Sequence, residues 1–324
     1  MMTPIKRSLL TLASSALLTL AATGLQAADK HLAITQIVEH PALDAVRQGV
    51  QDELAERGYS VGTNLKWSYE SAQGSPATAA QIAKKFAGES PDVIVAIATP
   101  SAQAAAASAR GIPLVFTAVT DPVGAKLVKG LDQPGRFITG MTDMSPINKH
   151  MALVKAVVPG AQRLGVIYNP GEANSVSLVT LVNEEAPKQG MSVVEAAATK
   201  SSDVQTAARS LVGKVDAIYL PTDNTVISAL EAIIKVAEQN RIPVITGDTD
   251  SVARGAVAAQ GFNYYEVGRQ TGIMVARILK GESPADMPVE GVERVELFVN
   301  PGAAQRMGIT LDSALVDSAK SVVE

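Results

Sequence analysis

Short runs of consecutive apolar residues alternate along the chain with longer segments in which apolar residues recur every three or four positions. After Pro41, which suits the first turn of a helix, Leu43, Val46 and Val50 follow the helical spacing. Continuous apolar runs are typical of strands buried on both faces. The pattern predicts strands at 32–38, 66–71, 93–98, 114–118, 164–168, 192–196, 217–220, 244–246 and 295–299. Repeated βα units of this kind favour parallel sheets covered by helices on both faces.

One strand–polar loop–helix–strand unit occurs twice in the chain. It runs through 91–115 and again through 215–245, and in both copies an Ile-Pro pair opens the second strand, at 112–113 and at 242–243. Repeated units of this kind can mark duplicated lobes. A single doubly wound domain could also contain such a repeat by chance, but duplication is the favoured interpretation.

The length of 324 residues is consistent with two domains. We expect one lobe to comprise 29–142 with a returning helix at 264–286, and the other to comprise 143–263 with 287–324. Ligands of open α/β sheets bind beyond the carboxyl ends of parallel strands. A cleft between two such lobes would collect these loops from both sides and close by hinge motion.

The first 28 residues have the pattern of a secretory signal peptide. Basic residues at positions 6 and 7 precede an apolar stretch at 8–20, and small residues offer a cleavage point near Ala27 or Ala28. The alternative is an N-terminal membrane anchor, but the stretch is short for a span of about 20 residues. The chain has no cysteine, so it has neither disulfides nor a lipid-attachment residue. We therefore expect a free periplasmic protein that is not a lipoprotein.

Composition and motifs exclude several function classes. The pI is near 5.6 without basic runs, which argues against nucleic-acid binding. The sequence contains no GxSxG, P-loop or HExxH motif. The histidines His31, His40 and His150 lack metal-ligand spacing, and His40 is expected in a surface turn beside Pro41. We therefore expect no catalytic residue, no metal and no cofactor.

Polar residues that follow predicted strands in the first half are candidates for ligand binding. Thr99 and Ser101 flank a proline at a helix start, where free N–H groups and the helix dipole favour a carboxylate. Thr120 and Asp121 follow the next strand, where the aspartate could bind a ligand ammonium group. Helix capping alone explains the same residue types, and both interpretations stay open.

The second half presents equivalent residues at its own strand ends. Asp223, Asn224 and Thr225 take the place of the Thr-Pro-Ser segment, and Asp248 takes the place of the aspartate in the first half. Asn174 and Ser175 open another polar helix start, where a purely capping role is the slightly favoured alternative. The remaining candidates near strand ends are Gln36, Glu39, Gln73 and Tyr168. One or two aromatic side chains in a cleft would suit a planar apolar ligand.

Over nearly all of its mature length the sequence resembles the substrate-binding components of ABC transporters, in the group that includes tryptophan- and phenylalanine-binding members. The motifs that carry the resemblance include His-Pro-Ala-Leu-Asp at 40–44, Ala-Gln-Gly at 72–74, Ala-Thr-Pro-Ser at 98–101, Thr-Asp-Pro-Val-Gly at 120–124, Tyr-Asn-Pro-Gly-Glu-Ala-Asn-Ser at 168–175, Pro-Thr-Asp-Asn-Thr at 221–225 and Asn-Pro-Gly-Ala-Ala at 300–304. The resemblance implies a periplasmic binding protein-like (type I-like) fold, with two Rossmann-like lobes, a hinge and three interlobe crossings. It also implies no catalysis, no cofactor and a membrane permease as partner.

These observations predict a monomeric solute-binding protein of an ABC importer that closes around a small polar ligand. An amino acid, which could be aromatic, is the favoured class of ligand. An alternative is a periplasmic sensor subunit for a membrane receptor. An α/β hydrolase or transferase is disfavoured because no nucleophile–base pair is visible. A lactose-repressor type of regulator shares the architecture, but the signal peptide and the absence of a DNA-binding headpiece argue against it.

Overall fold

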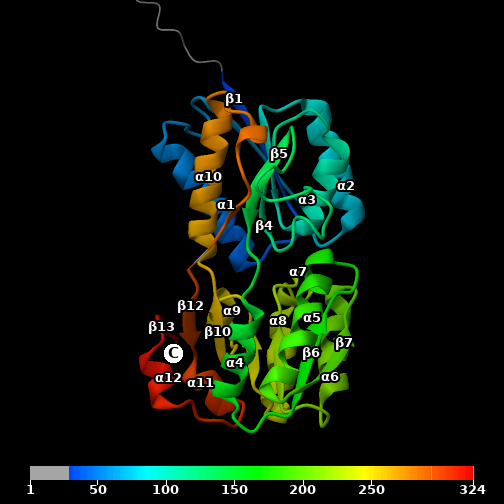
Figure 1. Cartoon of the computed structure of the whole chain (residues 1–324), viewed down its shortest axis with the longest axis vertical. Helices are drawn as coiled ribbons and strands as arrows, with labels where there is room; N and C mark the ends of the chain where they lie inside the picture. The colour runs from blue at the N-terminus through cyan, green and yellow to red at the C-terminus, as the bar shows by residue number, and fades with distance from the viewer. Residues whose placement is uncertain (1–28, 293, 324) are drawn as a thin grey trace, which may run out of the picture.

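The described chain forms two α/β lobes stacked end to end (Figure 1). The computed structural model describes residues 29–292 and 294–323, and the expected signal peptide lies outside this part. No helix within it is both long enough and apolar enough to cross a lipid bilayer.

Lobe one is built on a parallel sheet in the order β11-β5-β4-β3-β1-β2. Its strands are β1 (Lys30–Gln36), β2 (Leu65–Ser71), β3 (Val93–Ile97), β4 (Leu114–Val119), β5 (Ile138–Thr142) and β11 (Glu290–Gly291). The central strands β3 and β4 are buried at every position, as their continuous apolar sequences predict.

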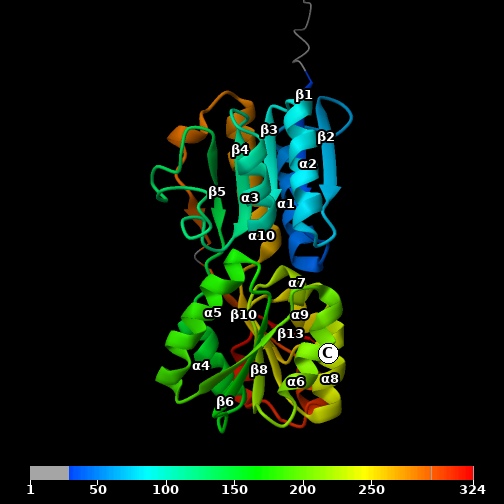
Figure 2. The same cartoon turned by 90° about the vertical axis from the view of Figure 1, so that its right-hand side faces the viewer.

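Helices cover both faces of this sheet (Figures 1 and 2). They are α1 (Pro41–Glu56), α2 (Pro76–Glu89), α3 (Thr99–Ser108) and α10 (Tyr264–Leu279). Helices α1 and α10 pack against each other on one face of the sheet, and α2 packs beside α3 on the other face. The returning helix expected from the sequence is therefore α10, which belongs to lobe one although it follows the strands of lobe two.

Lobe two contains a sheet in the order β13-β12-β10-β9-β8-β6-β7, in which only β12 runs antiparallel to a neighbour, β10, among the described strands. Its strands are β6 (Arg163–Tyr168), β7 (Ser192–Ala197), β8 (Ala217–Leu220), β9 (Val244–Thr246), β10 (Ala258–Gly261), β12 (Glu296–Val299) and β13 (Ser321–Val322). Its helices are α4 (Ile147–Val157), α5 (Ala173–Glu185), α6 (Val204–Leu211), α7 (Asn224–Ile227), α8 (Leu230–Asn240), α9 (Asp250–Ala253), α11 (Pro301–Arg306) and α12 (Ser313–Asp317).

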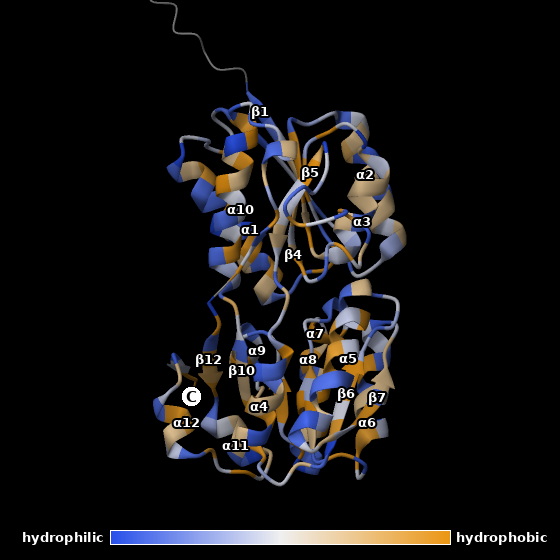
Figure 3. Cartoon of the chain, viewed as in Figure 1, coloured by the Kyte–Doolittle hydropathy of each residue, from blue (hydrophilic) through white to orange (hydrophobic). Residues whose placement is uncertain are grey.

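The two sheets share one strand order. In lobe one the strands run β2-β1-β3-β4-β5, and in lobe two β7-β6-β8-β9-β10. The two copies of the sequence repeat accordingly occupy equivalent places, at β3 to β4 and at β8 to β9. Two doubly wound α/β lobes, as predicted, are therefore confirmed, and each lobe has its own apolar core (Figure 3).

The chain passes between the lobes three times among the described residues (Figure 1). The passages lie between β5 and α4, between β10 and α10, and between β11 and β12. The predicted boundary after 286 lies too early, because β11 still pairs with β5 in the sheet of lobe one. Only the strand after it, β12, joins lobe two.

Helices α1 and α10 approach each other closely because glycines face each other's backbone. A Cβ atom built on Gly268 would lie 2.1 Å from the carbonyl oxygen of Val46, and one on Gly49 would lie 2.2 Å from that of Tyr265. No side chain larger than hydrogen fits at either position without separating the helices. This contact fixes α1, whose N-terminus reaches the space between the lobes.

Candidate functional site

A cavity lies between the lobes, at the edge where strands of both sheets end. It is lined by His40, Ala42, Leu43, Ala118, Thr120, Asp143, Asn174, Thr222, Asp223, Asn224, Ile227, Asp248 and Tyr264. Parallel strands place their carboxyl ends at one edge of a sheet, so loops that follow several strands meet there. The cavity is thus where the predicted cleft was expected.

The lobe-one wall comes from the start of α1 and the loop after β4. His40 precedes the first helical residue, Pro41, and the residue is only 9% exposed. Ala42 and Leu43 follow in the first turn and are buried against the cavity. Ala118 ends the regular part of β4 with a left-handed backbone (φ 51°), and Thr120 comes after it.

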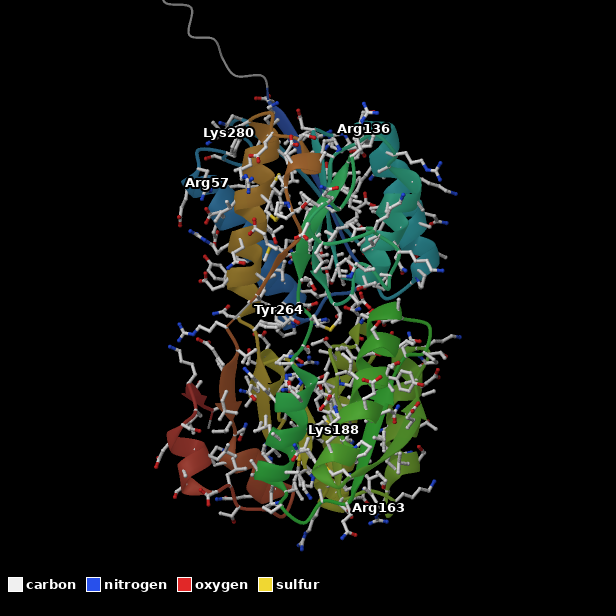
Figure 4. The ribbon with its side chains drawn as sticks, viewed as in Figure 1. Arg57, Arg136, Arg163, Lys188, Tyr264 and Lys280 are labelled. Carbon is white, nitrogen blue, oxygen red and sulfur yellow. The ribbon has the colours of Figure 1, made fainter. Side chains whose placement is uncertain are left out.

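Asp143 lies at the first passage between the lobes, directly after β5. Its carboxylate accepts hydrogen bonds from Thr120 Oγ1 (3.3 Å) and from the Tyr264 hydroxyl (2.7 Å). Tyr264 opens α10 and lies where the two lobes meet (Figure 4). Burial raises the pKa of the Asp143 carboxyl, an effect that the two hydroxyl donors only partly oppose.

The lobe-two wall is organised by a buried glutamate behind it. Glu172 accepts hydrogen bonds from the backbone N–H groups of Asn224 (3.2 Å) and Thr225 (3.0 Å), and from the Asn224 side chain (2.5 Å). Asn174 donates to the Thr222 carbonyl (3.0 Å), which joins the start of α5 to the loop before α7. These bonds hold the two helix starts together as one polar surface.

Asp223 combines a capping role with a place in the cavity wall. Its carboxylate accepts hydrogen bonds from the N–H groups of Val226 (2.8 Å) and Asn169 (2.6 Å). Burial and the nearby Glu172 raise the pKa of the Asp223 carboxyl, because two negative charges in one dry region disfavour each other.

Asp248 adds a third carboxylate to the cavity, after β9. It accepts hydrogen bonds from the N–H (2.9 Å) and hydroxyl (2.8 Å) of Ser251 at the start of α9. Burial raises the pKa of the Asp248 carboxyl. Its neighbour Asp250 has its pKa raised to about 6, mainly by burial and then by Asp248. The cavity thus collects acidic groups that are costly to ionise without a cationic partner.

The rest of the lining is apolar. Leu43 comes from lobe one and Ile227 from lobe two, and the ring of Tyr264 contributes the aromatic surface of this lining. The remaining small side chains, Ala42 and Ala118, leave room beside them. Most of the lining residues are polar, so the site combines convergent polar groups with a smaller apolar surface.

Of the residues predicted from the sequence, the structure brings together five in the cavity wall: Thr120, Asn174, Asp223, Asn224 and Asp248. The others do not line it: Gln36, Glu39, Gln73, Thr99, Ser101, Asp121, Tyr168, Ser175 and Thr225. Ser175 and Thr225 lie directly beside lining residues. Ser175 supports Asp223 with a hydrogen bond that lowers the carboxyl's pKa, and the Thr225 hydroxyl donates to Glu172 (2.7 Å).

Several other candidates have structural partners away from the cavity. Gln36 is buried and donates to Asp44 (2.9 Å), and the exposed Glu39 accepts from the Tyr69 hydroxyl (3.1 Å). The Tyr168 hydroxyl donates to Glu195 on the neighbouring strand (2.7 Å). Gln73 instead lines a separate groove at the interlobe edge, together with Ser201, Thr225 and others.

The candidate residues at the two helix starts of the first half lie in different surroundings. Thr99 and Ser101 are buried at the start of α3, and neither hydroxyl has a hydrogen-bond partner among the described residues. Asp121 accepts a hydrogen bond from Gly124 N (2.8 Å) within its own loop, and from the Ser177 hydroxyl of lobe two (3.2 Å). Asp121 therefore bridges the two lobes rather than lining the cavity.

The residues predicted to bind ligand do not include three prominent lining residues: His40, Asp143 and Tyr264. The expectation that His40 lies in a surface turn is wrong, because α1 starts at the cavity and buries the ring. Burial, with Arg254 nearby, lowers the pKa of His40 to about 3, so the ring is neutral. The only sequence signal that places His40 at the site is its position after a predicted strand. Asp143 and Tyr264 lie at passages between the lobes, which strand patterns do not locate.

Comparison with known proteins places these features in a family. The family model described as "ABC transporter substrate binding protein" matches residues 31–323. A protein of Clostridioides difficile called tyrosine-binding protein is 42% identical over 271 residues, which cover 84% of this chain and 79% of that protein.

Two solved structures bear on the arrangement of the lobes. A domain from Streptococcus pneumoniae in complex with L-Trp is 32% identical, covers 91% of this chain and all of its own, and has a TM-score of 0.88. A ligand-free, open substrate-binding protein from Clostridium difficile is 42% identical over 91% of this chain and 99% of its own, yet its TM-score is 0.68.

The more identical protein is thus the less similar in shape. Because both alignments cover the same share of the chain, the difference indicates a different placement of the lobes. The lobes of this chain are arranged more like those of the L-Trp complex than like those of the open structure. The matched model, the relative that is 42% identical and the two-lobed fold together show that the chain belongs to the family of ABC transporter substrate-binding proteins.

Proposed function

We propose that this chain is the exported binding component of an ABC importer and holds an aromatic amino acid, as a zwitterion, in the cavity between its lobes. Hinge closure would enclose the ligand, and a membrane permease would receive it from the monomeric protein. The observation that carries the proposal is the enclosed cavity with three buried carboxylates. The tyrosine-binding relative and the L-Trp complex support the ligand class.

The charges of the cavity favour an ammonium group. Among the described residues, no Lys or Arg forms an ion pair with Asp143, Asp223 or Asp248, although all three are buried. An ionised carboxylate in a dry site needs a cationic or strongly donating partner. A ligand ammonium group, with its three N–H donors, would supply that partner.

The apolar part of the lining favours an aromatic side chain. Leu43, Ile227 and the Tyr264 ring offer apolar surface beside the carboxylates. An aromatic ring could bury a large apolar area there and pack against the tyrosine ring.

Titration calorimetry of the purified mature protein tests this function. L-Tyrosine, L-tryptophan and L-phenylalanine are compared with a branched aliphatic amino acid and with galactose. We expect one ligand per chain, micromolar or tighter affinity for at least one aromatic amino acid, and much weaker binding of galactose. Absence of binding by all three aromatic amino acids, with the protein folded, would refute the proposal.

Affinity should fall as the solution is acidified. A bound ammonium group favours the ionised carboxylates, whereas burial raises the pKa values of Asp143, Asp223 and Asp248 above the ordinary value of about 3.9. These carboxyls hence gain protons at a higher pH than exposed aspartates, and each protonation removes an attractive charge. We expect the affinity to fall by up to about tenfold per pH unit below the highest of these pKa values.

The ligand-free protein should respond to pH in the opposite sense. A carboxyl whose pKa is raised by folding destabilises the fold as it ionises, so stability falls as the pH rises through that pKa. The melting-temperature increase caused by the ligand should therefore be larger near pH 8 than near pH 5. His40 and His150 do not explain such a change, because burial lowers their pKa values to about 3 and about 4. Equal affinity at both pH values would contradict the charge argument.

The transport role is tested in cells. Deleting the gene should reduce the uptake of the radiolabelled aromatic amino acid at low external concentration, and an intact copy should restore it. Unchanged uptake, together with tight binding by the purified protein, would favour the sensor alternative instead.

A further inference from the structure

The first turn of α1 presents unsatisfied N–H donors to the cavity. Pro41 occupies the first helical position, and no side chain caps the helix start. The N–H of Asp44 bonds to the His40 carbonyl, whereas those of Ala42 and Leu43 have no acceptor among the described residues. The first N–H groups of a helix have no intrahelical partners, and α1 is 16 residues long.

The side chain next to this helix start is also unsatisfied. His40 lines the cavity, is nine-tenths buried, and its Nδ1 has no hydrogen-bond partner among the described residues. A buried ring nitrogen without a partner is costly unless a ligand completes its hydrogen bond. Backbone N–H groups and an unpartnered ring nitrogen therefore lie on one side of the cavity.

One side of the cavity is less acidic than the other. Arg254 of lobe two acts on His40 electrostatically as a positive charge, although its guanidinium is already paired with Glu231 (2.7 Å). Asp44, the acidic residue in the first turn of α1, already forms an ion pair with Arg47 (3.1 Å) and accepts a hydrogen bond from the Gln36 amide (2.9 Å). The macrodipole of a long helix adds partial positive charge at its N-terminus. By contrast, the lobe-two wall carries carboxylates.

We propose that His40 and the N–H groups of the first turn of α1 form the subsite for the carboxylate of the bound amino acid. The inference rests on the proposed function and gives the ligand a direction. Its carboxylate faces the α1 start in lobe one, and its ammonium group faces Asp143 and the carboxylates of lobe two. His40 donates a ring N–H to the carboxylate, so the site distinguishes amino acids from the corresponding amines.

This subsite differs from the one that the sequence suggested. Thr99 and Ser101 also lie at a helix start in lobe one, but neither belongs to the cavity wall. Their hydroxyls are buried and have no hydrogen-bond partner among the described residues. Ser101→Ala is therefore a matched control, because it removes a buried hydroxyl group at the rival helix start.

The test compares L-tyrosine with tyramine, which keeps the ammonium group and the ring but lacks the carboxylate. Both are titrated into the parent protein and into the His40→Ala, His40→Gln and Ser101→Ala variants. We expect the parent to bind L-tyrosine at least about tenfold more tightly than tyramine. His40→Ala should remove most of this difference by weakening L-tyrosine alone, and His40→Gln, which retains an N–H donor, should restore part of it.

The controls separate the possible failures. Ser101→Ala should keep the preference for L-tyrosine, and the ligand-free melting temperature checks that each variant is folded. If His40→Ala weakens both ligands equally, or if Ser101→Ala rather than His40→Ala abolishes the preference, the proposed subsite is wrong while the proposed function stands. If the parent binds neither ligand nor any other aromatic amino acid, the proposed function itself fails.

Discussion

An Asp143→Asn variant is expected to bind aromatic amino acids at least about thirtyfold more weakly than the parent, a loss of about 2 kcal/mol or more. Asparagine keeps the size of the side chain and can still accept the hydrogen bond that the Tyr264 hydroxyl donates over 2.7 Å. It removes the negative charge that would partner the ligand ammonium group. Titration calorimetry near pH 8 measures the effect, because the parent carboxylates are most fully ionised there.

Asp121→Asn is the matched control for that variant. Asp121 bridges the lobes through the Ser177 hydroxyl and lies outside the cavity wall, so its change should alter affinity by less than about threefold. The ligand-free stability of Asp143→Asn should be unchanged or higher, because burial raises the pKa of the native carboxyl and makes its ionisation costly. Equal losses of affinity in both variants would show that Asp143 has no special role.

Replacing Gly268 with alanine should produce a large loss of stability in lobe one. The new Cβ would lie 2.1 Å from the Val46 carbonyl oxygen, so α10 and α1 must separate. We expect a loss of about 3 kcal/mol or more in the free energy of unfolding. The melting temperature should fall by about 6–12 °C, measured by circular dichroism without ligand.

Gly88→Ala provides the matched control in another helix of the same lobe. Gly88 lies within α2, and an added Cβ there would have no atom within 4 Å. This variant should be neutral or more stable by about 0.5–1 kcal/mol, because alanine favours a helix interior. A Gly268→Ala protein as stable as Gly88→Ala would mean that α1 and α10 do not pack as closely as described.

The sequence predicted much of the fold because most core strands are continuous apolar runs. Strands β5 and β10 escaped notice because their sequences, Ile-Thr-Gly-Met-Thr and Ala-Ala-Gln-Gly, are short and rich in small or polar residues. Their extended structure depends on pairing with neighbours, as β10 pairs with β9 and β12. The third passage was misplaced because the two residues of β11 carry no local signal of their pairing with β5.

The part of the candidate site that lies in loops directly after strands could be predicted from the sequence. Asp223 and Asp248 follow central strands of lobe two, and their loops reach the cavity as the strand-end rule predicts. Tyr168 also ends a strand of that sheet, but its side chain turns outward to Glu195. Asp143 and Tyr264 required the three-dimensional structure, because the path of the chain between the lobes decides that they meet.

A crystal structure of the mature protein with L-tyrosine tests the central claim most directly. We expect electron density for one tyrosine in the interlobe cavity, with the ammonium group within hydrogen-bond distance of the carboxylates of Asp143, Asp223 or Asp248. The tyrosine carboxylate should contact His40 and the first turn of α1. Density for the ligand outside this cavity, or an ammonium group without any of these carboxylates as partner, would contradict the account.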